Sequence, residues 1–266
     1  MAGVSPVEII DGRRDAGLLL LCDHASNALP AEYGSLGLPG EAFARHIAYD
    51  IGAAGVTRRL ANLLQCPAVL TTFSRLLIDP NRGADDPTLI MRLSDGAIVP
   101  GNARVSAEEI GRRRREFWQP YRDCVSGSLD EMLTAGPVPA VIAIHSFTPS
   151  WKADPRPWHV GILWDVDDRL ARPTITALKA DDNLVVGDNE PYDGALEGDT
   201  MYHHGTMGGL PHMLIEIRQD VVADAAGEAA WAERLGRLLS PILADPELHQ
   251  VKHFGTRAHP SSLRSG

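Results

Sequence analysis

Six short segments rich in apolar residues predict the strands of a buried sheet. Two of them, at residues 17–22 and 139–144, are continuous apolar runs, which is the pattern of strands covered by other elements on both faces. The other four lie at residues 67–73, 160–164, 183–186 and 211–218. We therefore expect an α/β fold whose central strands are fully buried.

Segments with helical character separate these strands. Apolar residues recur at helical spacing over residues 41–65. Ser106, followed three residues later by Glu109, is a capping box that opens a helix. The expected helices span residues 41–65, 106–135, 168–180 and 224–243.

Composition and charge narrow the class of protein. The 266 residues include 25 Lys+Arg and 35 Asp+Glu, and the net charge of −10 argues against nucleic acid or an anionic membrane surface as a partner. Three widely spaced cysteines, with no N-terminal signal segment and no apolar run near the ~18 residues of a membrane span, predict a cytoplasmic protein with reduced thiols. No repeat or domain boundary is evident, so we expect one catalytic domain over residues 1–247 and a C-terminal tail over residues 248–266.

Polar side chains follow two of the buried strands directly. His24 comes after the first strand and His145 after the strand at 139–144. Open α/β sheets bind their ligands at the carboxyl ends of parallel strands, so both histidines are expected at one edge, available for metal binding or catalysis. Glu216 lies between two isoleucines of the last strand, and a buried glutamate is either paired, here with Arg218, or functional.

Two further groups contain candidate site residues. Arg75, Asn81 and Arg82 surround the end of an apolar run, where a guanidinium fork suits a carboxylate ligand. The alternative is a structural ion pair of one arginine with Asp79. His46 and Asp50 are four residues apart in an expected helix, as two metal ligands or as a hydrogen-bonded pair would be.

Taken in order, these motifs resemble the N-formylglutamate amidohydrolase family. The resemblance extends over roughly residues 17–220 and rests on residues 23–27, 50, 74–82, 145–147 and 215–218. It implies a fold similar to zinc carboxypeptidases and aspartoacylases, a single domain with a mixed, mostly parallel sheet flanked by helices on both faces. It also implies a zinc-dependent hydrolase that cleaves the amide bond of an N-formyl or other N-acyl amino acid, such as N-formyl-L-glutamate.

The resemblance assigns a metal site and its chemistry. His24, Asp50 and His145 are expected to bind one Zn²⁺ per chain, a three-ligand set typical of catalytic zinc. Asn27 stands where the carboxypeptidase pattern has a glutamate ligand, so the carboxylate is expected from Asp50, with His46 as the alternative third ligand. Glu216 would be the general base.

The remaining roles concern the substrate, an N-acyl amino acid as a small-molecule partner. Arg75 would stabilise the oxyanion, while Asn81, Arg82 and Ser146 would bind the substrate. Arg218 would bind a side-chain carboxylate or neutralise Glu216 or Asp220. The long loop over residues 187–209, with Tyr202, His203 and His204, is expected to cover the site.

Two other functions fit parts of the pattern. A non-catalytic module that binds a small carboxylate would use the same arginines without turnover. A metal-dependent phosphoesterase would use the same ligands, although no glycine-rich phosphate loop supports it. The oligomeric state is left open.

Overall fold

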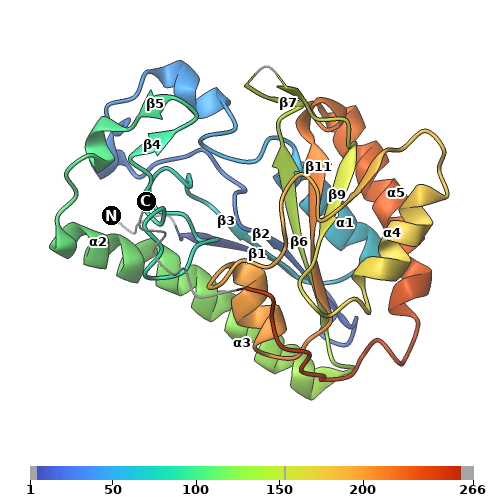
Figure 1. The fold of residues 1–266 in the computed structure, drawn as a ribbon. Coiled ribbons are helices and arrows are strands. Elements are labelled where there is room, and N and C mark those ends of the chain that lie inside the picture. The colour runs from blue at the N-terminus through green and yellow to red at the C-terminus, as the bar shows by residue number, and fades with distance from the viewer. Residues whose placement is uncertain (1–4, 153, 259–266) are drawn as a thin grey trace.

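The computed structural model describes residues 5–152 and 154–258. A seven-stranded sheet crosses the molecule (Figure 1). In spatial order the strands are β1 (Val7–Ile10), β3 (Ala68–Thr71), β2 (Leu18–Cys22), β6 (Ala140–Phe147), β11 (His212–Arg218), β9 (Val160–Leu163) and β10 (Val186–Asp188).

The sheet is mixed, as predicted. Its four central strands, β3, β2, β6 and β11, are parallel to one another. The edge strand β1 is antiparallel to β3, and β9 is antiparallel to β11 on the other side. The strand β1 is not among the six predicted strands, because an edge strand does not need the continuous apolar pattern of a central one.

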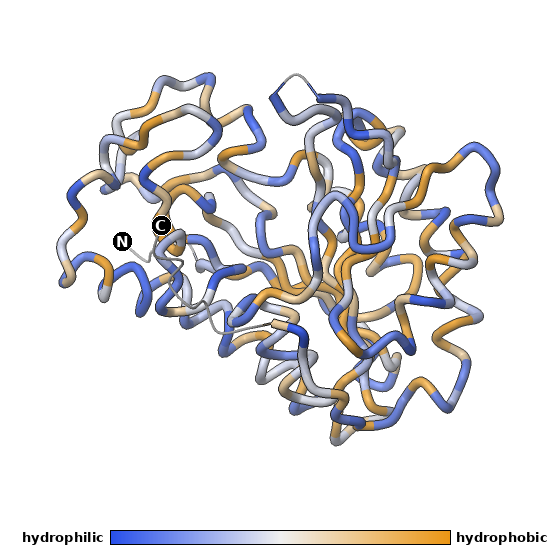
Figure 2. The backbone as a smooth tube through the Cα atoms, in the orientation of Figure 1, coloured by the Kyte–Doolittle hydropathy of each residue, from blue (hydrophilic) through white to orange (hydrophobic). Residues whose placement is uncertain are grey.

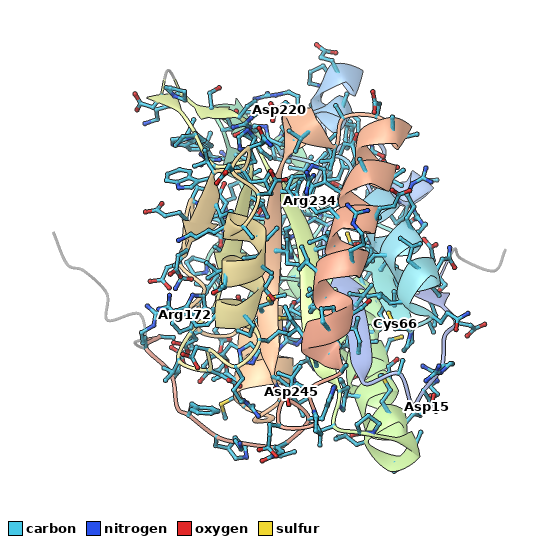
Figure 3. All side chains as sticks on the ribbon, turned by 90° about the vertical axis from the view of Figure 1, so that its right-hand side faces the viewer. Asp15, Cys66, Arg172, Asp220, Arg234 and Asp245 are labelled. Carbon is cyan, nitrogen blue, oxygen red and sulfur yellow. The ribbon has the colours of Figure 1, made fainter. Side chains whose placement is uncertain are left out.

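Helices cover both faces of the sheet, which confirms the predicted class. The helices α1 (Ala53–Leu64), α4 (Ala171–Lys179) and α5 (Ala225–Leu243) pack on one face, and α3 (Gln119–Ala135) packs on the other (Figure 1). Alternate residues of β2 point into the two cores, Leu18 and Leu20 into one and Leu19 and Leu21 into the other. In Figure 2 the apolar positions concentrate in these central strands, and Figure 3 shows the sheet from the side of α4 and α5.

Short elements complete the described part of the chain. The helix α2 (Ala107–Arg113) continues through a π-helical turn (Arg114–Trp118) into α3. As predicted, the Ser106 hydroxyl caps α2, because it accepts a hydrogen bond from the Glu109 backbone N–H. Two hairpins, β4 (Leu93–Ser94) with β5 (Ala97–Ile98) and β7 (Ser150–Trp151) with β8 (Asp154–Pro155), lie outside the main sheet, together with 3₁₀ turns at Ala31–Tyr33, Gly40–Ala44, Pro100–Asn102 and Gln219–Val221.

The helix predicted over residues 41–65 is wrong for its first half. After the short turn at Gly40–Ala44 the chain forms irregular turns, and α1 begins only at Ala53. The Asp50 backbone N–H donates to the His24 carbonyl, and the Ala48 carbonyl accepts from the Arg75 N–H. These tertiary hydrogen bonds replace the helical ones, so the apolar spacing serves burial there without a helix.

The C-terminal segment is described as far as residue 258. Leu248 is buried in the core beside α5, and the Lys252 N–H donates to the Gly209 carbonyl. Arg257 pairs with Asp193. Residues 259–266 of the predicted tail lie outside the described residues. Over the ranges that are described, no helix is long and apolar enough to cross a membrane.

Candidate active site

Strand alternation brings three polar side chains to one face of the sheet. Residues two apart on a strand share a face of the sheet. Asp23 therefore lies on the same face as Leu21, His145 on the face of Ala143, and Glu216 on the face of Leu214. The pairing register places Leu21 opposite Ala143 and Glu216 opposite His145. The apolar core beneath α3 therefore gives way to ionisable groups at the carboxyl ends of β2, β6 and β11, near β7 in Figure 1.

His24, Asp50 and His145 converge at this edge. Each offers one ligand atom, and the three atoms lie within 4.8 Å of one another. The Asp50 Oδ2 atom lies 3.3 Å from the His24 Nδ1 atom and 2.9 Å from the His145 Nδ1 atom. All three side chains are buried. This cluster contains the expected ligand set, with Asp50 as its carboxylate.

The outer ring nitrogens of both histidines contact further carboxylates. The His24 Nε2 atom lies 2.8 Å from Asp79 Oδ1, and the His145 Nε2 atom lies 2.8 Å from Asp23 Oδ2. Histidine ligands of metals are commonly oriented by such a carboxylate, which fixes the ring and makes the inner nitrogen more basic. Two imidazoles and a carboxylate are also a donor set that zinc prefers. The residues therefore fit a metal ion.

The charges around the cluster favour a cation. Burial opposes the ionisation of Asp23, Asp50 and Asp79, but contacts with His145, His24 and Arg75 hold the pKa of all three below the usual value. Burial likewise opposes protonation of His145, yet the neighbouring Asp23 and Asp50 raise its pKa well above the usual value. The three ionised carboxylates carry more negative charge than Arg75 beside them can balance. This excess of negative charge favours a proton or a metal ion at the histidines.

The orienting roles of Asp23 and Asp79 were not assigned from the sequence. The sequence predicts Asp79 only as an ion-pair partner of an arginine, and it does pair with Arg75 at 2.7 Å. Asp23 is held in turn by the Thr200 hydroxyl, which donates to its Oδ1 atom at 2.7 Å. One sequence feature could have identified Asp23: it lies two residues after Leu21 and so continues the strand face of Leu19 and Leu21.

Glu216 is buried at the same edge, and its Oε2 atom has no hydrogen-bond partner within the described residues. Burial raises the pKa of Glu216 to about 7. Arg218 does not pair with it: the guanidinium donates to Asp220 and to the carbonyls of Arg156 and Pro157. Of the roles expected for Arg218, its contacts match neutralisation of Asp220, and it does not line the cavity described next.

A cavity of about 310 Å³ opens beside the cluster. Most of the residues expected in the site line it, namely His24, Asp50, Arg75, Asn81, Arg82, His145, Ser146 and Glu216. His46 also lines the cavity but stands apart from the ligand cluster, with its Nε2 atom 3.5 Å from an Asp95 oxygen. The long loop covers the cavity with an earlier part than expected. Residues 192–201 contribute to the lining, and Tyr202, His203 and His204 do not.

The segment that contains Arg75, Asn81 and Arg82 forms turns beyond β3. The Arg75 guanidinium binds Asp79, and its Nη1 atom lies 3.6 Å from Asp50 Oδ1. The Asn81 carboxamide oxygen accepts from the Thr200 backbone N–H. Arg82 donates from Nε to the Thr88 hydroxyl and from Nη1 to the Asn81 carbonyl. The Ser146 hydroxyl donates to the Ile51 carbonyl. These contacts fix the side chains at the cavity wall.

Replacing the orienting carboxylate tests the fit to a metal. We expect Asp23→Asn to weaken zinc affinity about 10- to 100-fold, because the amide is a poorer acceptor for the His145 ring and leaves the metal-facing nitrogen less basic. The measurement is competition for zinc with a coloured chelator. Asp220→Asn, at a position outside the cavity, is the matched control. Equal affinity in the two variants would contradict the orienting role of Asp23.

Comparison with known proteins decides the family. The family model described as N-formylglutamate amidohydrolase matches residues 16–223. The chain belongs to this family. It is accordingly a hydrolase that acts on an amide, and the resemblance noted from the motifs is confirmed.

Solved structures agree with this N-formylglutamate amidohydrolase fold. The gene product Atu2144 of Agrobacterium tumefaciens is 33% identical, with a TM-score of 0.87, over 92% of this chain and 97% of that one. An N-formylglutamate amidohydrolase from Ralstonia eutropha JMP134 is 18% identical, with a TM-score of 0.69, over 90% of this chain and 97% of that one, and shows the shared fold. No curated protein matches the chain significantly.

Proposed function

We propose that the chain is a zinc-dependent amidohydrolase that cleaves the amide bond of an N-formyl or other N-acyl amino acid, such as N-formyl-L-glutamate. One observation carries the proposal. A buried cluster with the ligand chemistry of catalytic zinc, His24, Asp50 and His145, shares a cavity with a buried carboxyl, Glu216, that has an unpaired oxygen within the described residues. One Zn²⁺ per chain would be held by the three ligands. When bound, the ion would act as a Lewis acid that polarises the substrate carbonyl and makes water more acidic.

Glu216 is the proposed general base. It takes a proton from water as the water oxygen bonds to the carbonyl carbon, and returns a proton to the amide nitrogen as the C–N bond breaks. The two products are a carboxylic acid and an amino acid with a free amine. For an N-formyl substrate the carboxylic acid is formic acid. A pKa of about 7, raised by burial, suits a group that both accepts and donates a proton near neutral pH.

Arg75 is the proposed oxyanion donor. Its guanidinium lines the cavity beside Asp50 and is held by Asp79, so it needs no reorganisation when negative charge develops on the carbonyl oxygen. One well-placed donor of this kind contributes about 3 kcal/mol to transition-state stabilisation.

Asn81 and Arg82 are proposed to bind the α-carboxylate. Since the Asn81 oxygen accepts from Thr200, its NH₂ group remains a donor, and no hydrogen bond from that group is found within residues 5–152 and 154–258. Arg82 supplies the charge. Ser146, whose hydroxyl is already engaged, contributes to the cavity wall.

Removing the Arg82 charge is expected to weaken substrate binding. A hydrogen bond to a charged group is worth about 1.5–3 kcal/mol, so Arg82→Met should raise KM about 10- to 100-fold for an N-formyl amino acid, with a smaller effect on kcat. The same variant should leave KM for the corresponding α-amide nearly unchanged. Steady-state kinetics on both substrates, with the exposed Arg115→Met as control, tests this. A similar loss on acid and amide would contradict α-carboxylate binding by Arg82.

The reaction class is tested by product analysis. Purified protein supplied with zinc should release formate and free amine from N-formyl amino acids in equal amounts. Release of phosphate from a phosphate ester in preference to amide cleavage would favour the phosphoesterase alternative. Calorimetric binding of N-formyl amino acids without turnover would favour the binding module.

A further inference from the structure

We infer that this cavity takes an apolar group of the substrate beside the α-carboxylate, and that it disfavours a second carboxylate. The apolar group is either the amino-acid side chain or a longer acyl chain, since both branch from the reacting amide. The inference rests on the proposed function, because it assumes that the amide lies at the His24, Asp50 and His145 cluster. It makes N-formyl-L-glutamate a poorer substrate than an apolar N-acyl amino acid.

The cavity has an apolar wall next to its catalytic end. Leu214 lies two residues before Glu216 on the same face of β11 and pairs across the sheet with Leu163 of β9, and both line the cavity. Aromatic and aliphatic side chains continue the wall. They are Phe147, Trp151, Trp164, Tyr192 and Leu196. A substrate group that extends beyond the amide therefore contacts apolar side chains. This contact favours the binding of an apolar group.

Among the residues that the structure describes, no lining arginine remains free for a second carboxylate, and no lysine lines the cavity. Arg75 pairs with Asp79 and Asp50, and its remaining donor capacity is assigned to the oxyanion. Arg82 is needed for the α-carboxylate. The loop cover contributes two carboxyl groups to the lining, Asp193 and Asp199, and no arginine or lysine. A glutamate side chain would thus be desolvated without a partner, which is costly.

Arg156 contacts three aromatic side chains of the wall, although it does not itself line the cavity. Its guanidinium carbon lies 5.8 Å from the Phe147 ring centroid, 5.4 Å from that of Trp151 and 5.1 Å from that of Tyr192. It also donates to the Tyr192 hydroxyl at 3.0 Å. These cation–π contacts and this hydrogen bond hold the rings in place, and Arg156 is not among the residues that line the cavity.

The loop that carries Tyr192 and Leu196 is seated directly on β9. A Cβ atom on Gly161 would collide with the Glu190 carbonyl oxygen, so the close approach requires glycine there. The Asn189 side-chain oxygen accepts from the backbone N–H groups of Trp164 and Gly194, which joins the loop to the end of β9. The apolar wall is therefore preorganised, which lowers the entropic cost of binding an apolar group.

A substrate panel distinguishes the two sources of the apolar group. One arm compares N-formyl-L-leucine, N-formyl-L-phenylalanine and N-formyl-L-glutamate, and the other compares N-acetylglycine with N-hexanoylglycine. We expect kcat/KM to be about 10-fold or more higher for the apolar compound in at least one arm. If the glutamate derivative equals or exceeds the others and the hexanoyl chain gives no gain, the inference is overturned while the proposed function stands. If no compound is hydrolysed, the proposed function itself fails.

A charge introduced into the wall gives an independent test. Leu196→Arg places a cation at a partly exposed lining position, and should raise kcat/KM for N-formyl-L-glutamate relative to N-formyl-L-leucine by about 10-fold. Leu196→Gln, of similar size and neutral, should not change the ratio in this direction. Leu133→Arg, at an exposed position on α3, controls for net charge. An unchanged ratio in Leu196→Arg would overturn the placement of the substrate against this wall.

Discussion

Glu216→Gln is expected to lower kcat by about 10²- to 10⁴-fold, the usual contribution of a positioned general base. The glutamine has nearly the same size and can still line the cavity, but it cannot accept a proton from water. Because Glu216 is not a member of the ligand cluster, zinc content should stay unchanged. Steady-state kinetics and metal analysis on the same preparation give both values.

The matched control is Glu228→Gln, which removes a partly buried carboxylate near Arg59 that does not line the cavity. It should keep full activity. Retention of more than half of the wild-type kcat in Glu216→Gln would rule out Glu216 as the base. Loss of zinc from that variant would instead make Glu216 a ligand.

The second large effect is expected at Asp50. Its Oδ2 atom contacts both histidines, and no other carboxylate joins their inner nitrogens in the ligand cluster found among the described residues. Asp50→Ala should therefore lose most of its zinc and nearly all activity. His46→Ala should retain both, since His46 lies near Asp95 outside the cluster.

Zinc retention in the two variants is measured after dialysis against a weak chelator. Thermal unfolding of each variant serves as a check, because Asp50 also accepts from the Ser146 backbone N–H and its loss can lower stability. Equal zinc retention in Asp50→Ala and His46→Ala, with both folded, would contradict the assignment of Asp50 as the third ligand.

Much of this site follows from the sequence because strands have a simple side-chain period. An apolar run followed by a histidine places the histidine at the sheet edge, and two parallel strands place both histidines together. The same rule applied to Leu21 would have brought Asp23 to this edge. A continuous apolar run within one short segment predicts a buried strand, so this part of the site needs no knowledge of distant contacts.

The parts that could not be predicted depend on contacts between distant segments. The helical spacing around Ile47 is real, but hydrogen bonds from Asp50 to His24 and from Arg75 to Ala48 hold that segment in turns. Arg218 has the spacing to reach Glu216, yet it turns to Asp220 and nearby carbonyls. Nor does composition indicate which part of the long loop covers the cavity, since the seat of that loop on Gly161 is a tertiary contact.

The most direct test is zinc stoichiometry measured together with hydrolysis of an N-formyl amino acid, before chelation, after chelation and after zinc is restored. We predict about one zinc per chain, loss of hydrolysis when zinc is removed, and recovery when it is added back. A protein that hydrolyses the amide equally well after complete removal of metal would contradict the proposal. So would a protein that binds no zinc and shows no turnover after zinc is supplied.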